Sequence, residues 1–323
     1  MQAESQSKRY VFLLLPDFSM LPMSCAVEVM RHANIYAGRQ VYEWVIAAES
    51  DEAATASCGI RFPRDIGLDE LKRDDTLIIC GGIGIKEKTT PAVLNWVRRE
   101  ARRGIRIGSI CTASYVMARA GLLDGKRATI HWENIDSFQE EFPEIELLKT
   151  VFTVDGNRFT ASGGVASVDL MISFIAADVS QDAANWIADQ MIYNTIRSEN
   201  DSQRLSIPTR IGVRHPKLSN VIQMMEENIE EPISPSILAK EVGMSTRQLE
   251  RLFRKYLDRS PKRYYMELRL YKARNLLMQT DMSVINVALA CGFSSPSHFS
   301  KCYRAQYDTT PYRERGARPS KEA

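Results

Sequence analysis

Ala239-Lys240-Glu241-Val242-Gly243-Met244-Ser245 returns 49 residues later as Ala288-Leu289-Ala290-Cys291-Gly292-Phe293-Ser294. Each copy has a small Ala where two helices can cross, a Gly in a tight turn, and a Ser that can open the next helix. The match continues with Leu249, Phe253, Arg254 and Pro261 in the first copy and with Phe299, Tyr303, Arg304 and Pro311 in the second. The second copy gains one residue after the turn. A repeat of this regularity predicts two helix-turn-helix units, and therefore a protein that binds DNA.

The helix after the first turn has one apolar stripe. Its apolar residues recur at i, i+3, i+4 and i+7, a spacing that predicts a buried face, and they are Leu249, Leu252, Phe253 and Tyr256. The same spacing turns a charged face outward, made of Arg247, Glu250, Arg251 and Lys255. We expect this face to meet DNA.

The helix after the second turn has the same organisation. Pro296 fits a first helical position, where its missing N–H costs nothing. Phe299, Cys302 and Tyr303 are expected to face inward. The residues left toward solvent, and therefore toward DNA, are Ser297, His298, Lys301 and Arg304.

These faces contain the side chains that read base edges. Arg247 and Arg251 are the best candidates for bidentate contact with guanine, and His298 and Lys301 are weaker candidates. The alternative is that the charged residues form a solvated helix face or contact phosphate alone. Ser245 and Ser294 are expected to cap helices and to donate to phosphate.

A long helix is expected between the two units. The apolar pattern of residues 261–279 predicts it, and such a helix could hold the units at a fixed separation. Two recognition helices on one rigid body would then enter successive major grooves, about 34 Å apart along the duplex.

Positive charge is concentrated in the same part of the chain. The net charge is +2, but residues 214–323 hold 19 Lys and Arg against 12 Asp and Glu, whereas residues 1–213 hold 23 against 28. A basic C-terminal part joined to an acidic N-terminal part is typical of a nucleic-acid module attached to another domain. A random fluctuation of surface charge is the alternative.

Composition excludes several classes of protein. With 323 residues, 44% hydrophobic and 25% charged, the chain is long enough for two ordinary globular domains. No apolar run approaches the roughly 20 residues that span a bilayer, and the polar start is unlike a signal peptide. We therefore expect a cytoplasmic protein without a membrane partner.

Cysteine and histidine usage points away from disulfides and metals. The chain has no CxxC pair, and most of its cysteines lie in apolar stretches; they are Cys25, Cys58, Cys80, Cys111, Cys291 and Cys302. This pattern indicates reduced, buried thiols. The four His residues show no metal-ligand spacing, so no metal and no other cofactor is expected.

The N-terminal part alternates strand and helix patterns. Strands are predicted at 10–15, 42–48, 76–80 and 105–110, and helices at 24–36, 91–103, 165–177 and 182–197. Residues 151–154 and 158–161, joined by Asp155-Gly156-Asn157, predict a hairpin. Alternation of this kind implies a parallel α/β sheet covered on both faces. The fold class is thus a flavodoxin-like α/β domain followed by an all-α domain with two helix-turn-helix motifs.

One strand of this part runs directly into a helix at a cysteine. Ile107-Gly108-Ser109-Ile110-Cys111-Thr112-Ala113-Ser114 has the layout of a nucleophile elbow, which places one side chain above the sheet beside a helix N-terminus. The helix dipole should lower the pKa of a thiol there. Gly81-Gly82 at another strand end could offer a backbone N–H to an oxyanion.

Both parts resemble known families. Residues 218–316 resemble the C-terminal domain of AraC/XylS-type regulators, through the repeated Ala-x-x-x-Gly-[Met/Phe]-Ser motif, Arg269, Ala273 to Leu277, and Thr310-Pro311 with Arg313. The N-terminal part resembles the PfpI-like branch of the class I glutamine amidotransferase-like fold. Its motifs are Leu15-Pro16-Asp17-Phe18, Cys80-Gly81-Gly82, Cys111-Thr112-Ala113, Ala120-Gly121-Leu122-Leu123-Asp124-Gly125, Thr129-Ile130-His131-Trp132 and Ser162-Gly163-Gly164 before Asp169. The whole chain resembles the GlxA-type AraC regulators.

The elbow departs from the catalytic members of that fold. They place a His directly after the Cys, where this chain has Thr112, and they supply an acid from the segment after the first strand, which here is Ser19-Met20-Leu21-Pro22-Met23 with no carboxylate until Glu28. A thiol without an orienting base and acid lacks the parts of a nucleophilic site. We therefore expect no enzyme activity and no catalytic residue. An active cysteine hydrolase fused to a DNA-binding domain stays an alternative, with His131 as its base.

The same region is expected to bind a metabolite instead. The candidate ligand-binding residues are Asp17, Gly82, Cys111, Thr112, His131 and Trp132. A helix N-terminus suits a carboxylate, and an indole face suits an amine or quaternary ammonium. The resemblance to GlxA-type regulators implies arginine, carnitine, glycine betaine or a similar amine carboxylate. Core packing of Trp132, or oxidation of Cys111 as a redox sensor, is the alternative.

The predicted organisation is a sensor domain at residues 8–197, a linker at 198–213, a DNA-binding domain at 214–316 and a tail at 317–323. The resemblance implies a ligand-responsive transcription regulator that binds double-stranded promoter DNA as a homodimer and works with RNA polymerase. We expect an activator of a catabolic operon.

Overall fold

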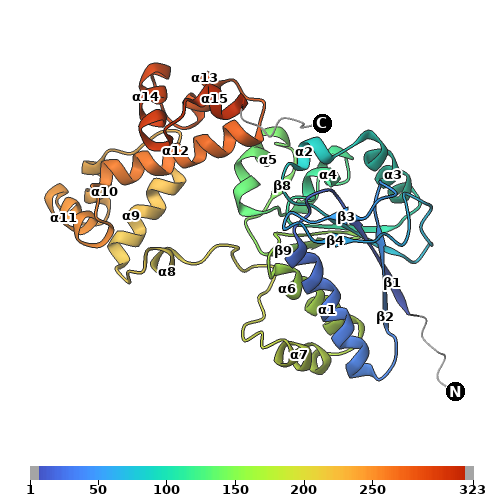
Figure 1. The fold of residues 1–323 in the computed structure, drawn as a ribbon. Coiled ribbons are helices and arrows are strands. Elements are labelled where there is room, and N and C mark those ends of the chain that lie inside the picture. Colours follow the sequence, from blue (N-terminus) through green and yellow to red (C-terminus); the bar gives the residue numbers. More distant parts are fainter. Residues whose placement is uncertain (1–6, 317–323) are drawn as a thin grey trace. The chain divides into compact units, whose positions relative to one another are not determined.

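The computed structural model describes residues 7–316 and divides them into two compact units, with the boundary between Gln203 and Arg204 (Figure 1). Within these residues, every helix is too short or too polar to cross a membrane.

A six-stranded sheet forms the centre of the first unit. Its order is β2-β1-β5-β6-β10-β9, and all neighbours are parallel except the β9–β10 hairpin. The strands are β1 (Lys8–Leu14), β2 (Tyr42–Ala47), β5 (Thr76–Cys80), β6 (Arg106–Ile110), β9 (Phe152–Asp155) and β10 (Arg158–Ala161). The predicted α/β sheet and hairpin are therefore confirmed.

Helices cover both faces of this sheet (Figure 1). The alternation within β1 shows why, since Tyr10 and Phe12 point into one core while Val11 and Leu13 point into the other. The first core is closed by α1 (Met20–Ala37), α6 (Ala166–Asp178) and α7 (Gln181–Gln190). The second is closed by α2 (Ile85–Lys88), α3 (Pro91–Arg102), α4 (Ser114–Arg119) and α5 (Ile135–Glu141).

Short elements complete the unit. Two small pairs lie outside the main sheet: β3 (Ala54–Thr55) with β4 (Arg61–Phe62), and β7 (Arg127–Ala128) with β8 (Glu146–Leu147). A 3₁₀ turn spans Trp132–Asn134.

The helix predicted at 182–197 is too long. α7 ends at Gln190, and Ile192 takes a left-handed conformation with φ 54°, after which the chain is not helical. The reason is tertiary, because Arg197 is fixed by an ion pair with Asp169 and Gln203 donates to Thr129 Oγ1.

The segment predicted as a linker, residues 198–213, is shared between the units. Residues up to 203 follow the first unit, where Ser202 bridges Thr150. Residues 207–211 form α8 (Ile207–Ile211) in the second unit, and Arg210 binds Glu226 there at 2.9 Å. Little free chain is left between the two units.

The second unit is all helical, as predicted. After α8 it contains α9 (Pro216–Glu227), α10 (Pro235–Glu241), α11 (Thr246–Leu257), α12 (Pro261–Gln279), α13 (Val284–Ala290), α14 (Pro296–Tyr307) and α15 (Pro311–Gly316). It has two apolar cores, one for each repeat. α12 enters both, with Tyr265 in the first and Leu270, Ala273 and Leu277 in the second.

The helices of this unit begin where the sequence provides caps. The hydroxyls of Ser234, Ser245, Ser260, Ser283 and Ser295 each accept a backbone N–H in the first turn. The predicted cap at Ser294 is one residue off, because Ser295 caps α14 by accepting from His298 N at 3.3 Å.

The expectation of buried thiols holds for part of the set. Cys25, Cys80, Cys111 and Cys291 are buried and free, whereas Cys58 is exposed and Cys302 is half-buried.

Candidate DNA-reading face and candidate effector site

The first helix-turn-helix unit consists of α10, a turn at Gly243 and α11. Gly243 has φ 62°, a conformation that glycine adopts without strain. Ser245 then forms a capping box with Gln248, because each side chain bonds the backbone N–H of the other. The box fixes the start of α11, while Leu249 and Phe253 bury its inner face.

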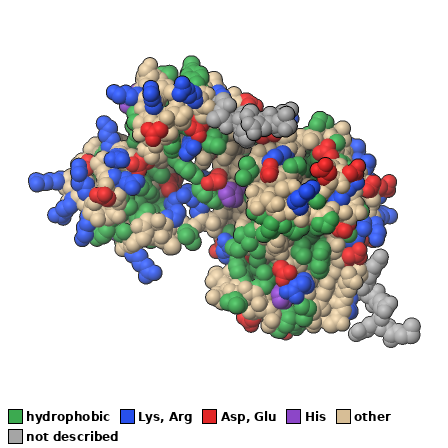
Figure 2. Space-filling view, viewed as in Figure 1, with side chains coloured by type: hydrophobic (Ala, Val, Ile, Leu, Met, Phe, Trp, Pro, Cys, Tyr) green, Lys and Arg blue, Asp and Glu red, His purple; other side chains and the backbone are tan. Residues whose placement is uncertain are grey.

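The outer face of α11 carries positive charge. Arg247, Arg251 and Lys255 are exposed, as predicted, and Arg254 adds a further exposed cation. Glu250 is half-buried. The Lys255 ammonium lies 4.9 Å from the centroid of the Tyr256 ring, which holds its stem against the helix. Lys and Arg side chains project from this part of the unit in Figure 2.

The second unit consists of α13, a turn at Gly292 and α14. Arg269 of α12 holds this turn by donating from Nε to Cys291 O at 2.8 Å and from Nη2 to Gly292 O at 2.6 Å. Its guanidinium also lies 4.1 Å from the centroid of the Phe293 ring. Sequence reasoning included Arg269 through the family resemblance alone, because its partners are backbone carbonyls that no pattern marks.

The outer face of α14 also carries positive charge. Ser297, His298, Lys301 and Arg304 are exposed, and the helix contains no acidic residue. Cys302 is less buried than predicted. It packs at the margin of the second core, and its Sγ lies 3.4 Å from His298 Nε2.

In the first unit, the elbow forms where β6 ends. Cys111 has φ 64°, a left-handed conformation that is uncommon for a residue with a side chain. Its N–H bonds Ala161 O at 3.0 Å, so the strand pairing with β10 continues into the turn. Gly163 packs on it so closely that a Cβ there would lie 3.0 Å from Cys111 Cα. The sharp turn predicted from Gly-Ser-Ile-Cys is present.

The predicted lowering of the Cys111 pKa is wrong. Burial raises the pKa of this thiol, which is 7% exposed, and bonds to Ser19 Oγ and to the Thr112 backbone oppose that effect without reversing it. The dipole argument fails because α4 has six residues and the side chain lies beneath Gly163. The Ser19 hydroxyl, 3.6 Å from Sγ, is a neighbour that sequence reasoning missed.

Three of the predicted effector residues meet beside the elbow. Thr112 Oγ1 donates to Gly82 O at 2.8 Å, and Ile83 N donates to Asp17 O at 3.3 Å. A Cβ on Gly82 would lie 2.1 Å from Asp17 O, so only glycine fits this crossing. The Asp17 carboxylate is paired with Lys88. Asp17 follows β1, Gly82 follows β5 and Thr112 follows β6. The strand order reverses between β1 and β5, and ligands of open α/β sheets bind at such points.

His131 and Trp132 lie next to the same elbow. His131 N donates to Cys111 O at 3.2 Å. The two rings are 5.7 Å apart, and Trp132 packs partly against the second core. Burial lowers the pKa of His131, which favours a neutral ring at pH 7. The structure therefore brings the six predicted effector residues into one neighbourhood at the carboxyl ends of the strands.

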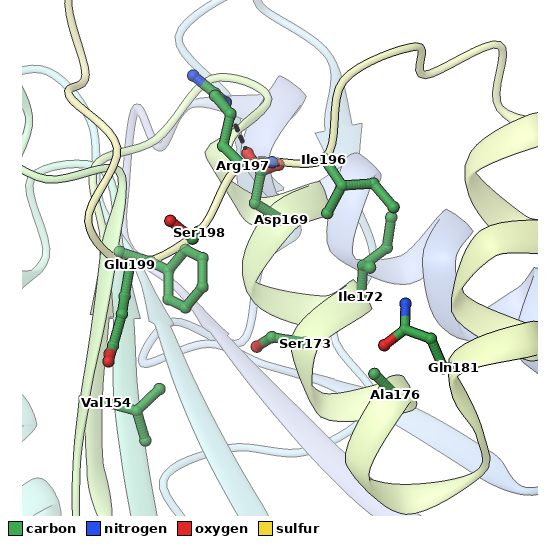
Figure 3. Close-up of a pocket in the computed structure, with 11 residues that line it drawn as sticks. Val154, Asp169, Ile172, Ser173, Ala176, Gln181, Ile196, Arg197, Ser198 and Glu199 are labelled. Atoms are coloured by element: carbon green, nitrogen blue, oxygen red, sulfur yellow. Dashed lines mark hydrogen bonds and ion pairs between the residues drawn. The ribbon is translucent and has the colours of Figure 1, made fainter.

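A separate hollow of about 390 Å³ lies between β9 and α6 (Figure 3). Ile172, Ser173 and Ala176 of α6 line one wall, and residues 196–199 contribute to the opposite side and rim. At its end the buried Asp169 carboxylate accepts from Tyr193 Oη at 2.9 Å and from Arg197 N, Nε and Nη2 at 2.7 to 2.9 Å. None of the predicted effector residues lines this hollow. The bonds of Tyr193 and Arg197 to Asp169 anchor the segment that leaves the first unit.

Comparisons with known proteins agree with this two-part design. Residues 8–177 match the DJ-1/PfpI family, and residues 238–317 match a helix-turn-helix domain. The chain is 43% identical to the HTH-type transcriptional regulator GbdR of Pseudomonas aeruginosa over 95% of its length and 84% of that protein. It is also 43% identical to the HTH-type transcriptional regulator CdhR of the same species, over 98% and 94%.

One solved structure supports the fold of the first unit. An AraC family transcriptional regulator from Pseudomonas putida is 22% identical, with a TM-score of 0.51, and covers 57% of this chain and 99% of that chain. At this identity the likeness concerns the fold alone.

Proposed function

We propose that this chain reads promoter DNA with α11 and α14 together. The chain belongs to the HTH-type transcriptional regulators that join a DJ-1/PfpI domain to an AraC-type helix-turn-helix domain. The observation that carries the proposal is α12, whose side chains enter the cores of both repeats. A shared helix of this kind fixes the spacing of two recognition helices.

Base reading falls to the exposed faces of these two helices. Arg247 and Arg251 of α11 suit guanine, with Glu250 and Lys255 beside them, and His298, Lys301 and Arg304 are their counterparts on α14. Ser245 is engaged in a capping box, so its role is to position the N-terminus of α11 toward phosphate. Ser297 is free to donate to phosphate.

Equilibrium binding of labelled promoter DNA tests this assignment. Each of Arg251→Ala and Lys301→Ala should weaken specific binding by about 1–3 kcal/mol and relax base preference at one position. A cation that contacts phosphate alone would instead weaken binding to all sequences alike. Unchanged affinity and selectivity in both variants would remove these residues from the interface.

The first unit serves as the sensor. We place a small amine carboxylate, of the class of arginine, carnitine or glycine betaine, beside Asp17, Gly82, Cys111, Thr112, His131 and Trp132. The support is that these residues converge near the reversal of strand order, and that an indole such as that of Trp132 suits a cation. Thr112 has its hydroxyl engaged with Gly82 O, so it shapes the site.

Catalysis is not part of the proposal. The thiol of Cys111 is buried and has a raised pKa, and it donates to the Ser19 hydroxyl, which is neither a base nor an acid at neutral pH. A nucleophilic thiol needs thiolate character. The same features argue against a redox sensor at Cys111.

Thermal unfolding in the presence of candidate effectors tests the sensor. A ligand at 100 times its Kd stabilises the folded state by about 2.7 kcal/mol, which raises the melting temperature. The rise should disappear in Trp132→Ala. A shift with peroxide alone, lost in Cys111→Ser, would favour the redox alternative instead.

A route from the sensor to the second unit runs through one short segment. His131 N bonds the elbow carbonyl of Cys111, and Gln203 Nε2 bonds both Ile130 O at 2.9 Å and Thr129 Oγ1 at 2.8 Å. Gln203 is the last residue of the first unit. We propose that a shift of residues 129–131 on ligand binding changes the hold on Gln203 and so the freedom of the DNA-binding unit.

We also propose how the regulator assembles and what it does in the cell. The regulator acts in the cytoplasm as a homodimer and activates a catabolic operon through RNA polymerase. Exposed apolar side chains of α1, Leu21, Ile35 and Tyr36, suit a contact with a second copy. Sedimentation velocity should find a dimer that Leu21→Asp weakens, and transcription in vitro should rise on adding the protein with its effector.

A further inference from the structure

Three arginines line a second hollow in the first unit, away from the elbow. Arg98 and Arg102 are one turn apart on α3, and Arg158 opens β10. Ala101, Ala120 and Leu122 complete the lining of about 320 Å³. None of these described lining residues is acidic. We call this site the arginine hollow.

Arg158 is the unusual member. It is 9% exposed, and it donates from Nη1 to Ile105 O and to Asn157 O, both at 3.1 Å. A guanidinium has five N–H donors, so those on Nε and Nη2 have no acceptor among the described residues. Burial lowers the pKa of Arg158, and no carboxylate contributes to raising it. The Nε and Nη2 groups are open to solvent, so an anion that enters the hollow can reach them.

Nearby carboxylates do not supply the missing charge. Asp155 lies opposite Arg158 in the hairpin, but it accepts from Lys126 Nζ at 3.0 Å and from Arg127 N at 3.1 Å. Glu100 of α3 is fully buried and is held by Arg99 and Arg103. Among the described residues, no carboxylate forms an ion pair with Arg98, Arg102 or Arg158.

The other two arginines leave room for an external anion. Arg98 donates to Arg119 O at 2.6 Å and to Ala120 O at 3.3 Å, which closes the end of α4 and fixes the guanidinium at the hollow. Arg102 is exposed and makes no bond to a described residue. Guanidinium groups match phosphate oxygens with paired N–H donors.

We propose that the arginine hollow binds the phosphate monoester of a small metabolite, as a second ligand distinct from the amine carboxylate at the elbow. Three cations favour an anion with more than one negative charge, and a phosphate monoester carries about −1.5 to −2 at pH 7. The volume is at the lower end of the roughly 300–1,000 Å³ of ligand sites, which exceeds the needs of a bare ion. Ala101, Ala120 and Leu122 offer apolar surface to the organic part.

Calorimetric titration of the full chain with glycerol phosphate and inorganic phosphate tests this site, with acetate and glycerol as reference ligands at constant chloride. Arg102→Gln should weaken glycerol phosphate binding about ten-fold, because it removes one charged donor and no internal bond. Arg158→Gln should abolish it. Arg73→Gln, an equal loss of charge at an exposed position outside the hollow, is the control and should bind like the parent.

Phosphate will also meet cations on α11 and α14, but that binding is common to all of these variants. Equal affinities in Arg102→Gln and Arg73→Gln would overturn the proposal, as would acetate binding as tightly as glycerol phosphate. If Arg158→Gln fails to fold, Arg102→Gln still decides the question. Weaker DNA binding in Arg102→Gln with unchanged phosphate ester binding would assign the hollow to the DNA backbone and also contradict the proposal.

Discussion

The two turn glycines provide a matched comparison of the repeats. Both have positive φ, 62° at Gly243 and 74° at Gly292, so an alanine at either position costs about 1–2 kcal/mol of backbone strain. Their surroundings differ. A Cβ at Gly243 would meet Lys217 Nζ at 3.8 Å, an ordinary contact with a flexible group. A Cβ at Gly292 would lie 2.6 Å from Ile229 O and 2.7 Å from Pro232 Cγ.

Gly292→Ala should therefore destabilise the second unit more than Gly243→Ala does. Contacts this short force backbone to move, and overpacking of this kind costs about 1–3 kcal/mol. The total expected loss is about 2–5 kcal/mol for Gly292→Ala, against about 1–2 kcal/mol for Gly243→Ala. Because Gly292 lies in the turn between α13 and α14, Gly292→Ala should also lose contacts to one half of the DNA site.

Urea unfolding followed by two signals measures this difference. All four tryptophans, Trp44, Trp96, Trp132 and Trp186, lie in the first unit, so their fluorescence follows that unit alone, whereas far-ultraviolet circular dichroism follows both. Both variants should leave the fluorescence transition in place and shift the dichroism transition. Equal shifts for the two alanines, or a larger shift for Gly243→Ala, would show that the close contacts around Gly292 add no cost to the alanine there.

Three further predictions follow from the first unit. Asp169→Asn leaves the half-buried Arg197 guanidinium without its carboxylate, so the fluorescence-detected unfolding free energy should fall by about 3 kcal/mol, the lower end of the range for a buried pair. A loss below about 1 kcal/mol would show that the pair is solvated. Since burial raises the pKa of Cys111, the thiolate that reacts with iodoacetamide is scarce at pH 7 and grows as pH rises toward and beyond the usual thiol range. Mass spectrometry should find exposed Cys58 labelled first at pH 7, and faster labelling of Cys111 would revive the redox alternative. Gln203→Met keeps the length of the side chain but removes its bonds to Thr129 and Ile130. The variant should still bind effector and DNA with the affinities of the parent, but the change in DNA affinity on adding effector should become smaller. An unchanged effect of the effector on DNA binding would exclude the proposed route.

The fold was predictable where local pattern and tertiary structure agree. The strand at Thr76–Cys80 is predicted to the residue because four apolar side chains follow Thr76 and Gly81-Gly82 ends the run. The paired helix-turn-helix units follow from spacing, since a turn Gly with a Ser close behind it recurs between two apolar helix patterns, although the cap of α14 is Ser295 and not Ser294.

The errors arise where tertiary contacts decide. The pattern at 182–197 continues as a helix, but Ile192 turns the chain and Asp169, far away in sequence, fixes Arg197. A helix dipole predicts a lowered pKa for Cys111, but Gly163 covers the thiol and burial raises its pKa. The arginine hollow joins residues 98, 102 and 158, which no local motif connects.

We propose that one rigid module reads DNA with two helices. Hydroxyl-radical footprinting of the full chain on its promoter tests it directly, with the parent protein beside Arg251→Ala and Lys301→Ala. We predict two protected backbone segments about 10–10.5 base pairs apart, with each variant losing protection in a different segment. A single protected segment, or loss of the same segment in both variants, would contradict the account.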